Sequence, residues 1–366
     1  MNKLSVLQIN SSKTWSGGET HLKDLLKGLI DRGYNISLAV RSQIAANFHD
    51  MDINLKVLPL KNSIDFYTVY KLVKIIKENQ IDIIHVHNGK DYWLAVFAQY
   101  FAGRAKVVAT RHILPPLGNS ILHQKMFAKI DHFIAVSEKV KDNLIQENNI
   151  QPEKISVVYN GMDLSNYNNI NSSYLYSELN ISKDNFIIGS VGGLCERKNQ
   201  KLLIDIAKEI KLEPIKFILV GEDFSDNKEY KNELLTKIKQ NNLEDRVIMT
   251  GYRKDIPELM NLFNLLVVPS KSEAFGLVAI EAMAAGTAVI ANKIDGLKEV
   301  IVDKDSGLLV YNNNIIKYKN EILNFYYNQK LMDKYIENGY KRVKTKFSLE
   351  KMISSVEKVY FKTQKI

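Results

Sequence analysis

Two glutamates, Glu273 and Glu281, are separated by seven residues in the segment 269–286, which reads PSKSEAFGLVAIEAMAAG. A β-branched run, Leu265–Val268, precedes this segment, and a helix is expected to begin near residues 275–276. Backbone N–H groups in the first turn of a helix lack intrahelical partners and attract anions. Carboxylates accept hydrogen bonds from sugar hydroxyls. The pattern therefore predicts a site for an anionic ligand that carries hydroxyl groups.

The surroundings of Glu281 separate two interpretations of this residue. A single glutamate on a helix usually belongs to a solvated face. Here the flanking residues are small and apolar, in the run LVAIEAMAA. A carboxylate in such a stretch requires a buried partner or a ligand. We therefore interpret Glu281 as a ligand-binding residue.

A second candidate site follows the first expected strand. The loop 10–19 ends in Gly17 and Gly18 and leads into an amphipathic segment, Glu19–Asp31. Because these glycines lack side chains, a phosphate or sugar could approach the N–H groups at the start of the helix. A flexible turn is the alternative. The G-x-G-x-x-G and G-x-x-x-x-G-K-[ST] fingerprints are both absent.

The elements that must position these residues alternate along the chain. Short β-branched runs alternate with longer amphipathic segments, which is typical of parallel sheets with right-handed crossovers. The expected strands are Leu4–Ile9, Ile36–Val40, Leu55–Leu58, Ile81–His85, Lys106–Thr110, His132–Val136, Ile155–Val158, Phe186–Val191, Ile215–Val220, Arg246–Thr250, Leu265–Val268, Ala288–Ala291 and Leu308–Val310.

A polar stretch, Ser165–Ser177, interrupts the alternation and is interpreted as an interdomain linker. The sequence therefore predicts two doubly wound α/β domains. Ligands bind beyond the carboxyl ends of parallel strands. Two such domains facing each other would place two binding edges across one cleft, an arrangement that suits a reaction between two substrates.

Composition limits the class of protein. The formal net charge is +9, from 50 basic and 41 acidic residues, and it is spread over both halves of the chain. This suits anionic small molecules or an anionic membrane face. No aromatic and basic motif accompanies the charge, so nucleic acid is not expected as a partner. Cys195 is the only cysteine, which excludes an intrachain disulfide and a cysteine-based zinc site.

No signal-peptide core is evident at the N-terminus, and no apolar run approaches the ~18 residues of a spanning helix. We expect a cytoplasmic protein whose membrane contact, if any, is peripheral. The segments Tyr70–Lys77 and Lys125–Ile130 combine lysines with apolar residues. They lead to the hypothesis of an anionic membrane partner; an ordinary solvated helix face is the alternative.

Motifs that carry a family resemblance follow one another along nearly the whole chain. They are GGETHL at 17–22, RGY at 32–34, DIIHVH at 82–87, FIAVS at 133–137, VYNGMD at 158–163, RKNQKLLI at 197–204, the S-x-x-E-A-F-G-L block at 270–277 and GLKEVI at 296–301. In these motifs the chain resembles the retaining glycosyltransferases of family 4. That resemblance implies the GT-B fold, with two Rossmann-like domains.

The implied acceptor-binding domain spans 1–165 together with a crossover helix at 348–366, and the implied donor-binding domain spans 175–347. The implied reaction moves a hexose from a nucleoside-diphosphate sugar, of the UDP or GDP type, to a hydroxyl of a glycan, a glycolipid, a lipid-linked acceptor or another acceptor. Synthesis of cell-surface polysaccharide or lipopolysaccharide is the implied setting.

The resemblance also assigns roles to residues of the second domain. The N–H groups at the start of the helix would bind the phosphate and sugar of the donor. Glu281 would bind the nucleotide ribose, and Glu273 would bind a hydroxyl of the transferred sugar. The residues that would supply the N–H groups are Phe275, Gly276 and Leu277.

Lys198 would hold the diphosphate and neutralise its charge as it departs. From the first domain, Gly17 and Gly18 would line the phosphate, and His112 would lie near the sugar. Taken alone, His112 would more often be a structural histidine. The residues left in that structural class are His85 and His87.

The chain departs from the family pattern at two places. The family has Gly-Arg-Leu after the first strand of its second domain, whereas this chain has Gly193 in place of the arginine. Either Arg197 supplies the missing charge, or it points to solvent. The family also favours Gly-Gly where this chain has Asp295 and Gly296.

Two other classes of function are compatible with the pattern. One is a sugar-nucleotide epimerase of the same fold. The other is a catalytically silent nucleotide-sugar-binding protein, although retention of Glu273, Glu281 and Lys198 argues against it. No His/Asp/Glu set has the spacing of a metal site, so we expect neither a metal nor another cofactor.

Overall fold

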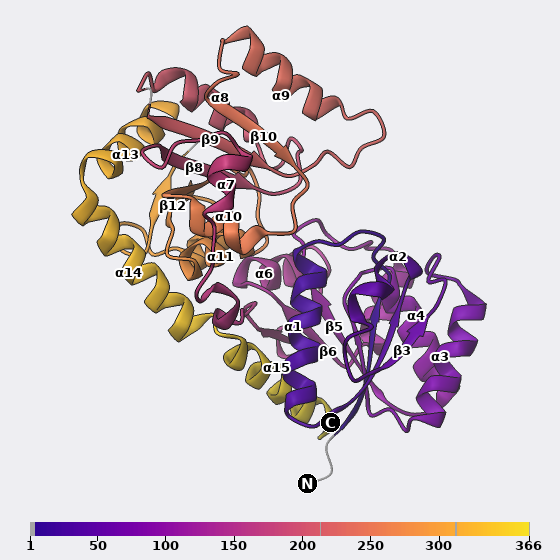
Figure 1. Cartoon of the computed structure of the whole chain (residues 1–366). Helices are drawn as coiled ribbons and strands as arrows, with labels where there is room; N and C mark the ends of the chain where they lie inside the picture. The colour runs from indigo at the N-terminus through magenta and orange to yellow at the C-terminus, as the bar shows by residue number, and fades with distance from the viewer. Residues whose placement is uncertain (1–3, 213, 312, 366) are drawn as a thin grey trace. The chain divides into compact units, whose positions relative to one another are not determined.

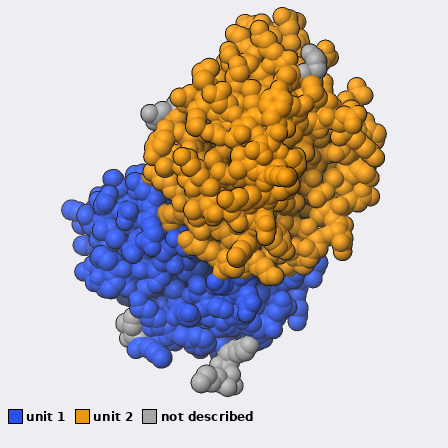
Figure 2. Space-filling model, turned by 90° about the vertical axis from the view of Figure 1, so that its left-hand side faces the viewer, with its two compact units in different colours: residues 1–162, 348–366 blue, residues 163–347 orange. Residues whose placement is uncertain are grey.

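The computed structural model describes residues 4–212, 214–311 and 313–365 (Figure 1). The chain divides into two compact units, coloured separately in Figure 2. Unit 1 comprises residues 1–162 and 348–366, and unit 2 comprises residues 163–347. The first segment of unit 1 thus ends at residue 162, shortly before the expected boundary at residue 165.

Unit 1 contains a seven-stranded sheet in the order β3-β2-β1-β4-β5-β6-β7, and every neighbouring pair is parallel. The strands are β1 (Ser5–Asn10), β2 (Asn35–Val40), β3 (Asn54–Val57), β4 (Ile83–Val86), β5 (Lys106–Arg111), β6 (His132–Ala135) and β7 (Ile155–Val157). The helices are α1 (Gly17–Asp31), α2 (Ser42–Ala45), η1 (Ala46–Phe48), α3 (Phe66–Glu78), α4 (Asp91–Ala102), α5 (Ile121–Lys129), α6 (Glu138–Gln146), η2 (Pro152–Lys154) and α15 (Leu349–Gln364).

Unit 2 contains a six-stranded parallel sheet in the order β10-β9-β8-β11-β12-β13. Its strands are β8 (Phe186–Val191), β9 (Ile215–Val220), β10 (Val247–Gly251), β11 (Leu265–Val268), β12 (Ala288–Asn292) and β13 (Leu308–Val310). Its helices are η3 (Leu164–Tyr167), α7 (Tyr174–Glu178), α8 (Gln200–Glu209), α9 (Glu229–Gln240), α10 (Ile256–Leu262), α11 (Leu277–Ala284), α12 (Asp295–Val300), α13 (Ile315–Tyr327) and α14 (Gln329–Lys346).

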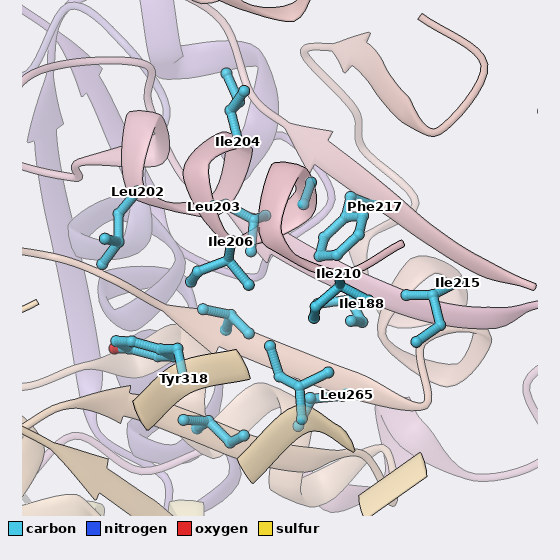
Figure 3. Close-up of a cluster of buried hydrophobic side chains, with 14 of the residues drawn as sticks. Ile188, Leu202, Leu203, Ile204, Ile206, Ile210, Ile215, Phe217, Leu265 and Tyr318 are labelled. Atoms are coloured by element: carbon cyan, nitrogen blue, oxygen red, sulfur yellow. The ribbon is translucent and has the colours of Figure 1, made fainter. Parts of the chain in front are cut away.

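The apolar periodicity of the helices accounts for the core of each unit. In unit 1, α1 buries one apolar stripe that includes Leu22 and Leu29, and α15 contributes Val356 and Tyr360 to the same cluster. In unit 2, residues of α8 such as Ile206 pack with Phe217 of β9 (Figure 3). Burial of such side chains supplies about 1.5–3 kcal/mol each.

The last helix returns to the unit in which the chain begins. Figure 1 shows α15 (yellow) beside α1 (indigo), and the two helices contact each other. Arg32, which caps the end of α1, forms an ion pair with Glu357 and donates a 3.0 Å hydrogen bond to Ser354 Oγ. A Cβ atom on Gly28 would lie only 2.5 Å from Ile353 Cγ1. The absence of a side chain at Gly28 therefore permits the close approach of α15.

Each expected strand is present, with ends displaced by at most two residues. The stretch interpreted as a linker, Ser165–Ser177, contains most of η3 and most of α7 and belongs to unit 2. Leu175 is fully buried, and Tyr174 donates a 2.5 Å hydrogen bond to Asp255 Oδ2. The buried side chain of Leu175 and the hydrogen bond of Tyr174 attach the segment to the rest of unit 2. Within the described stretches, no helix combines the length and apolar composition that crossing a bilayer requires.

We predict that Gly28→Ala lowers the free energy of unfolding by about 1–3 kcal/mol, because the new methyl group overpacks the contact with Ile353. Alanine has the higher helix propensity, so the loss must come from packing. Denaturant midpoints of Gly28→Ala, Ile353→Ala and the double variant measure the effect. The added methyl group should be tolerated once Ile353 is truncated. An equal loss in both backgrounds would contradict the packing explanation.

Candidate active site

In unit 2, Lys198 and Glu273 form an ion pair. Lys198 follows β8 and Glu273 follows β11, and these neighbouring parallel strands end at the same edge of the sheet. Lys198 Nζ lies 2.5 Å from Glu273 Oε1, which also accepts a 2.7 Å hydrogen bond from Ser270 Oγ. Only 8% of Glu273 is exposed. The fold therefore brings together two residues that the sequence assigned to one site.

Arg197 lies beside the same carboxylate. Its NH1 atom donates a 3.0 Å hydrogen bond to the carbonyl oxygen of Ser272 and lies 3.5 Å from Glu273 Oε2. The side chain is 53% exposed, so it borders the solvent while contacting the loop. Arg197 therefore combines features of both alternatives, since it contacts the carboxylate paired with Lys198 and is also exposed to solvent. At Gly193, a Cβ atom would have its nearest neighbour at 4.0 Å, so sterics do not require glycine there.

The start of α11 depends on two glycines. Gly276 has a φ of 109°, which side chains rarely permit, and its Cβ would lie 2.6 Å from Leu297 Cδ2. Gly296 donates a 3.2 Å backbone hydrogen bond to the carbonyl oxygen of Glu273, and its Cβ would lie 2.6 Å from Phe275 N. Where the family favours Gly-Gly, this chain has Asp295 and Gly296. The glycine that is kept, Gly296, is the one that lies too close to Phe275 for a side chain.

The other residues assigned to this helix start differ in burial. Phe275 is buried, and its ring lies 5.5 Å from that of Phe347. Leu277 is half-buried, as is Glu281. Glu281 lies between the fully buried residues Ile280 and Ala282. Its carboxylate is therefore carried on a helix whose neighbouring positions are in the core.

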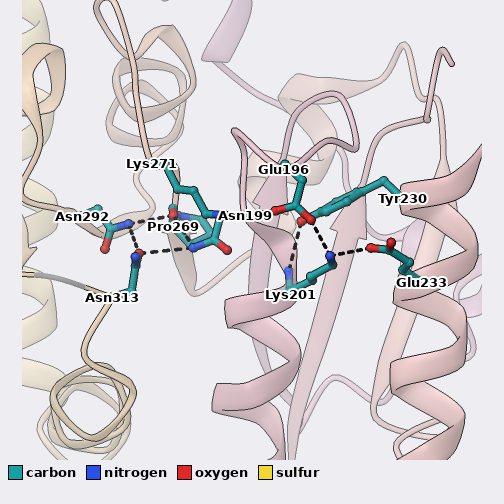
Figure 4. Close-up of polar contacts among 9 residues, drawn as sticks. All are labelled: Glu196, Asn199, Lys201, Tyr230, Glu233, Pro269, Lys271, Asn292 and Asn313. Carbon is teal, nitrogen blue, oxygen red and sulfur yellow. Dashed lines mark hydrogen bonds and ion pairs between the residues drawn. The ribbon is translucent and has the colours of Figure 1, made fainter.

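Three asparagines hold the loop that leads to Glu273, and the sequence analysis missed them. Asn292 Nδ2 donates hydrogen bonds of 2.7 Å to the Pro269 carbonyl and 2.5 Å to Asn313 Oδ1 (Figure 4). Asn199 Nδ2 donates to the same two oxygens, each at 3.2 Å. The sequence could have pointed to both donors, because Asn199 directly follows Lys198 and Asn292 is the last residue of a strand.

In unit 1, Gly17 is the first residue of α1, and Gly18 follows it. The buried carboxylate of Glu19 fixes this turn, accepting hydrogen bonds of 2.6 Å from Ser16 Oγ and 3.2 Å from Asn10 Nδ2. The spacing Ser16-x-x-Glu19 is that of a capping box and could have revealed this residue. The two glycines therefore begin a helix whose entry is fixed by buried polar contacts.

His112 follows β5 and belongs to a cluster of histidines in unit 1. Its Nε2 atom lies 3.2 Å from Nδ1 of His87, and the two rings are stacked. The ring of His21, on α1, lies 4.9 Å from that of His112. Burial lowers the pKa of His21 to about 4 and holds the pKa values of His87 and His112 well below 6.5. All three imidazoles are therefore neutral at pH 7.

Within the described ranges, His21, His87 and His112 could hold a metal ion, because their ligand atoms lie within 4.8 Å of one another. Spacing along the chain could not reveal this set, since the residues come from three separate segments. The structural role assigned to His85 agrees with its contacts: the ring is fully buried, with Tyr360 Oη at 2.7 Å and Thr110 Oγ1 at 2.6 Å.

Asp91 begins α4 with a fully buried side chain. Its Oδ2 atom accepts a 2.9 Å hydrogen bond from the backbone N–H of Ser11. Desolvation nevertheless outweighs this hydrogen bond and the charge of Lys90, and raises the pKa of Asp91 to about 6. The loop after β1 is therefore tied to a carboxylate whose burial is costly.

Known proteins match the two halves of the chain. Residues 15–166 match the model of Glycosyltransferase Family 4, and residues 176–342 match that of Glycosyl transferases group 1. An uncharacterized glycosyltransferase of Methanocaldococcus jannaschii is 30% identical over 365 residues, which cover 98% of each chain. The chain belongs to the family 4 glycosyltransferases of group 1, and its two parallel-sheet units have the GT-B fold.

Relatives with named activities are more distant. The N-acetyl-alpha-D-glucosaminyl L-malate synthase of Bacillus anthracis is 27% identical, covering 92% of each chain. A UDP-Gal:alpha-D-GlcNAc-diphosphoundecaprenol alpha-1,3-galactosyltransferase of Escherichia coli is 26% identical, covering 81% of this chain and 79% of its own. Anabaena HepE, solved with UDP and glucose, is 25% identical, with a TM-score of 0.85 over 97% of this chain and 99% of its own.

We predict that Asp91→Asn stabilises the protein at pH 7 by about 1–3 kcal/mol and has little effect below pH 4. The folded state holds the Asp91 proton up to a pH of about 6. The unfolded state releases it near pH 4, so the aspartate costs stability as pH rises between these values. Denaturant titrations at several pH values measure the difference. The matched control is Asp142→Asn, at an exposed position of α6. Lower stability of Asp91→Asn at pH 7 would contradict the prediction.

Proposed function

We propose that the protein transfers a hexose from a UDP- or GDP-type sugar to a hydroxyl of a glycan or lipid-linked acceptor, with retention of the anomeric configuration. The observation that carries the proposal is the cluster of Lys198, Arg197 and Glu273 at the start of α11. Its two cations and one carboxylate have a net charge of +1. This excess suits the diphosphate of a nucleotide sugar.

The cluster supports a specific division of roles. In transfer, the bond from the anomeric carbon to the diphosphate breaks, and a bond from that carbon to the acceptor oxygen forms. The diphosphate leaves with the electron pair, and one of its oxygens takes the proton that the acceptor hydroxyl loses. Lys198 and Arg197 stabilise the departing negative charge, and Arg adds a bidentate geometry suited to phosphate oxygens.

The carboxylates recognise hydroxyl groups. Glu281 binds the ribose diol of the donor, and Glu273 binds a hydroxyl of the transferred sugar while it orients the ammonium of Lys198. The N–H groups at the start of α11 add positive potential for the phosphate. Within unit 1, we assign binding of a sugar hydroxyl to His112 and binding of a phosphate to the Gly17–Gly18 turn. These groups supply the charge that the reaction needs, so we propose that transfer requires no metal ion.

The relatives support the choice of donor and acceptor class. HepE was solved with UDP and glucose, and the E. coli relative is named for a UDP-Gal donor and a diphosphoundecaprenol acceptor. We therefore propose UDP as the first nucleotide to test, and a role in cell-surface polysaccharide or lipopolysaccharide synthesis at the cytoplasmic side of the membrane.

A panel of UDP and GDP sugars, supplied with and without lipid-linked acceptors, tests the function. Glycosylated acceptor should form with one nucleotide class and should persist in excess chelator. Glu281→Gln should lower the specificity constant about ten- to a hundred-fold, because it removes a charged hydrogen-bond acceptor worth about 1.5–3 kcal/mol. Lys334→Gln, at an exposed position of α14, is the matched control. An isomeric sugar nucleotide as the product would instead identify an epimerase, and absence of nucleotide binding would identify a silent protein.

For the two cations, we predict that Arg197→Ala and Lys198→Ala each weaken donor binding and turnover. Lys198→Ala should have the larger effect, because its ammonium is the more buried. The double variant should lose less than the sum of the single losses, since both charges act on one diphosphate. Steady-state kinetics measure all three. A wild-type specificity constant for Arg197→Ala would show that Lys198 acts alone.

We propose that unit 1 contacts anionic membranes. The residues we propose for this contact lie at the start of α3 and not in the segment Lys125–Ile130. The apolar residues of the segment Lys125–Ile130 on which the hypothesis rested are buried; they are Met126, Phe127 and Ile130. Aromatic residues at the start of α3 are exposed instead, and Lys71 Nζ lies 5.4 Å from the ring centroid of Tyr67. The exposed set is Phe66, Tyr67 and Tyr70.

Vesicle sedimentation tests this contact. Phe66 is 74% exposed, so Phe66→Ser combined with Lys71→Ser should weaken binding to anionic vesicles without unfolding the protein. Each interfacial cation contributes on the order of 1 kcal/mol near an anionic surface. Tyr100→Ser is the matched control, because Tyr100 is 78% exposed near the end of α4. Equal sedimentation of the wild type with neutral and anionic vesicles would rule the contact out.

A further inference from the structure

The histidine cluster of unit 1 offers more nitrogen ligands than the proposed reaction uses. His21 comes from α1, His87 follows β4 and His112 follows β5. His87 Nδ1 and His112 Nε2 are 3.2 Å apart. A tetrahedral zinc ion with Zn–N distances of 2.0–2.1 Å places its ligand nitrogens about 3.3 Å apart. This pair therefore already has the spacing of two ligands on one ion.

His21 supplies the third nitrogen. It is only 5% exposed, and its Nδ1 atom has no hydrogen-bond partner among the described residues. A buried polar atom without a partner is destabilising, because it loses its hydrogen bonds to water on folding. The ligand nitrogens of all three histidines lie within 4.8 Å of one another, so coordination of a shared ion requires only small side-chain shifts. The cluster thus combines a buried nitrogen, which has no hydrogen-bond partner in the described part of the chain, with three histidines close enough to share one ion.

A hydrogen-bond network orients His87 for coordination. Gln8 Nε2 donates a 3.0 Å hydrogen bond to Tyr360 Oη, so the amide oxygen of Gln8 faces His87 Nε2 at 2.8 Å. His87 Nε2 must then carry the proton, which leaves the lone pair on Nδ1, the atom next to His112. Histidines that bind metals usually donate their second N–H in this way.

The same network extends to His85. Because Tyr360 Oη accepts from Gln8, it donates its own proton to His85 Nδ1 at 2.7 Å, and His85 Nε2 donates to Thr110 Oγ1 at 2.6 Å. Gln8, His85 and Tyr360 are fully buried. The orientation of His87 is therefore fixed by side chains that cannot exchange their partners for water.

We propose that His21, His87 and His112 form a binding site for a divalent transition metal ion, Zn²⁺, with a fourth position open to an exogenous oxygen ligand. Three neutral imidazoles favour zinc over Mg²⁺ and Ca²⁺, which prefer oxygen ligands. His112 is the least buried of the three, so the open position lies on its side of the cluster.

Occupation of the site has a consequence that rests on the proposed function. His112 is the histidine assigned to the sugar, and its Nε2 atom is one of the ligand atoms adjacent to His87. An imidazole nitrogen bound to zinc no longer accepts a hydrogen bond from a sugar hydroxyl. Zinc should therefore inhibit transfer, and excess chelator should restore it.

Metal binding by the full chain is tested first, without reference to activity. Equilibrium dialysis should find one Zn²⁺ per chain, and Co²⁺ should give the intense visible absorption of a tetrahedral site. His21→Gln should abolish the Co²⁺ spectrum and weaken Zn²⁺ binding at least about 100-fold. Gln8→Met, which removes no ligand but deletes the hydrogen bonds of Gln8 to His87 and Tyr360, should weaken binding about 10- to 100-fold. The matched control is His49→Gln, at an exposed position of the same unit.

Circular dichroism and thermal unfolding establish that each variant is folded, and His112→Asn serves as a second ligand variant if His21→Gln unfolds. Absence of stoichiometric Zn²⁺ binding by the wild type would overturn the proposal. An unchanged Co²⁺ spectrum in folded His21→Gln or His112→Asn would do the same. Binding without inhibition would retain the site and refute only its link to transfer, whereas inactivity of metal-free enzyme on every sugar nucleotide would refute the proposed function alone.

Discussion

The parallel alignment of the strands in each sheet is the constraint on which both candidate sites depend. Because neighbouring strands run in one direction, the loops that follow them emerge at the same edge. Lys198 and Glu273 follow two such neighbours, β8 and β11, and this is why residues far apart in the sequence share one ion pair. His87 and His112 follow β4 and β5 in the other sheet in the same way. Reversal of a single strand would separate either pair.

Burial of the Lys198–Glu273 ion pair is energetically unfavourable in itself, and hydrogen bonds around it offset this cost. A nearly buried carboxylate is destabilising unless it is paired and hydrogen-bonded. Glu273 meets this requirement with Lys198 and Ser270, and the loop that carries it is held by asparagine side chains that bond its backbone oxygens. The charges of Lys198 and Glu273 are thus held in place by the protein's own side chains and loops.

The sequence predicted those parts of the molecule that depend on local pattern. β-branched runs and apolar periodicity identified the strands, and the Glu-x7-Glu spacing identified Glu273 and its loop. Asn313 carries no such signal, and the motif GGETHL that contains His21 does not mark it as a possible ligand, because the contacts of both residues come from distant parts of the sequence. The composition of Ser165–Ser177 predicted a linker for a related reason: it is that of a loop, and it did not show that Leu175 is buried. The membrane hypothesis included Met126 on composition alone, which did not show that this side chain is buried.

The return of α15 to unit 1 means that unit 2 is an insertion within unit 1 in the chain's connectivity. On the ribosome, the segment 163–347 is complete before the helix that finishes unit 1 has been made. Until then, the stripe of α1 that contains Leu22 and Leu29 lacks part of its cover, and the hydroxyl of Tyr360 is not yet available to Gln8 and His85. Exposed apolar surface of this kind promotes aggregation of incomplete chains. Loss of even the last turns of the chain would therefore damage the first domain to be synthesised and leave the second intact.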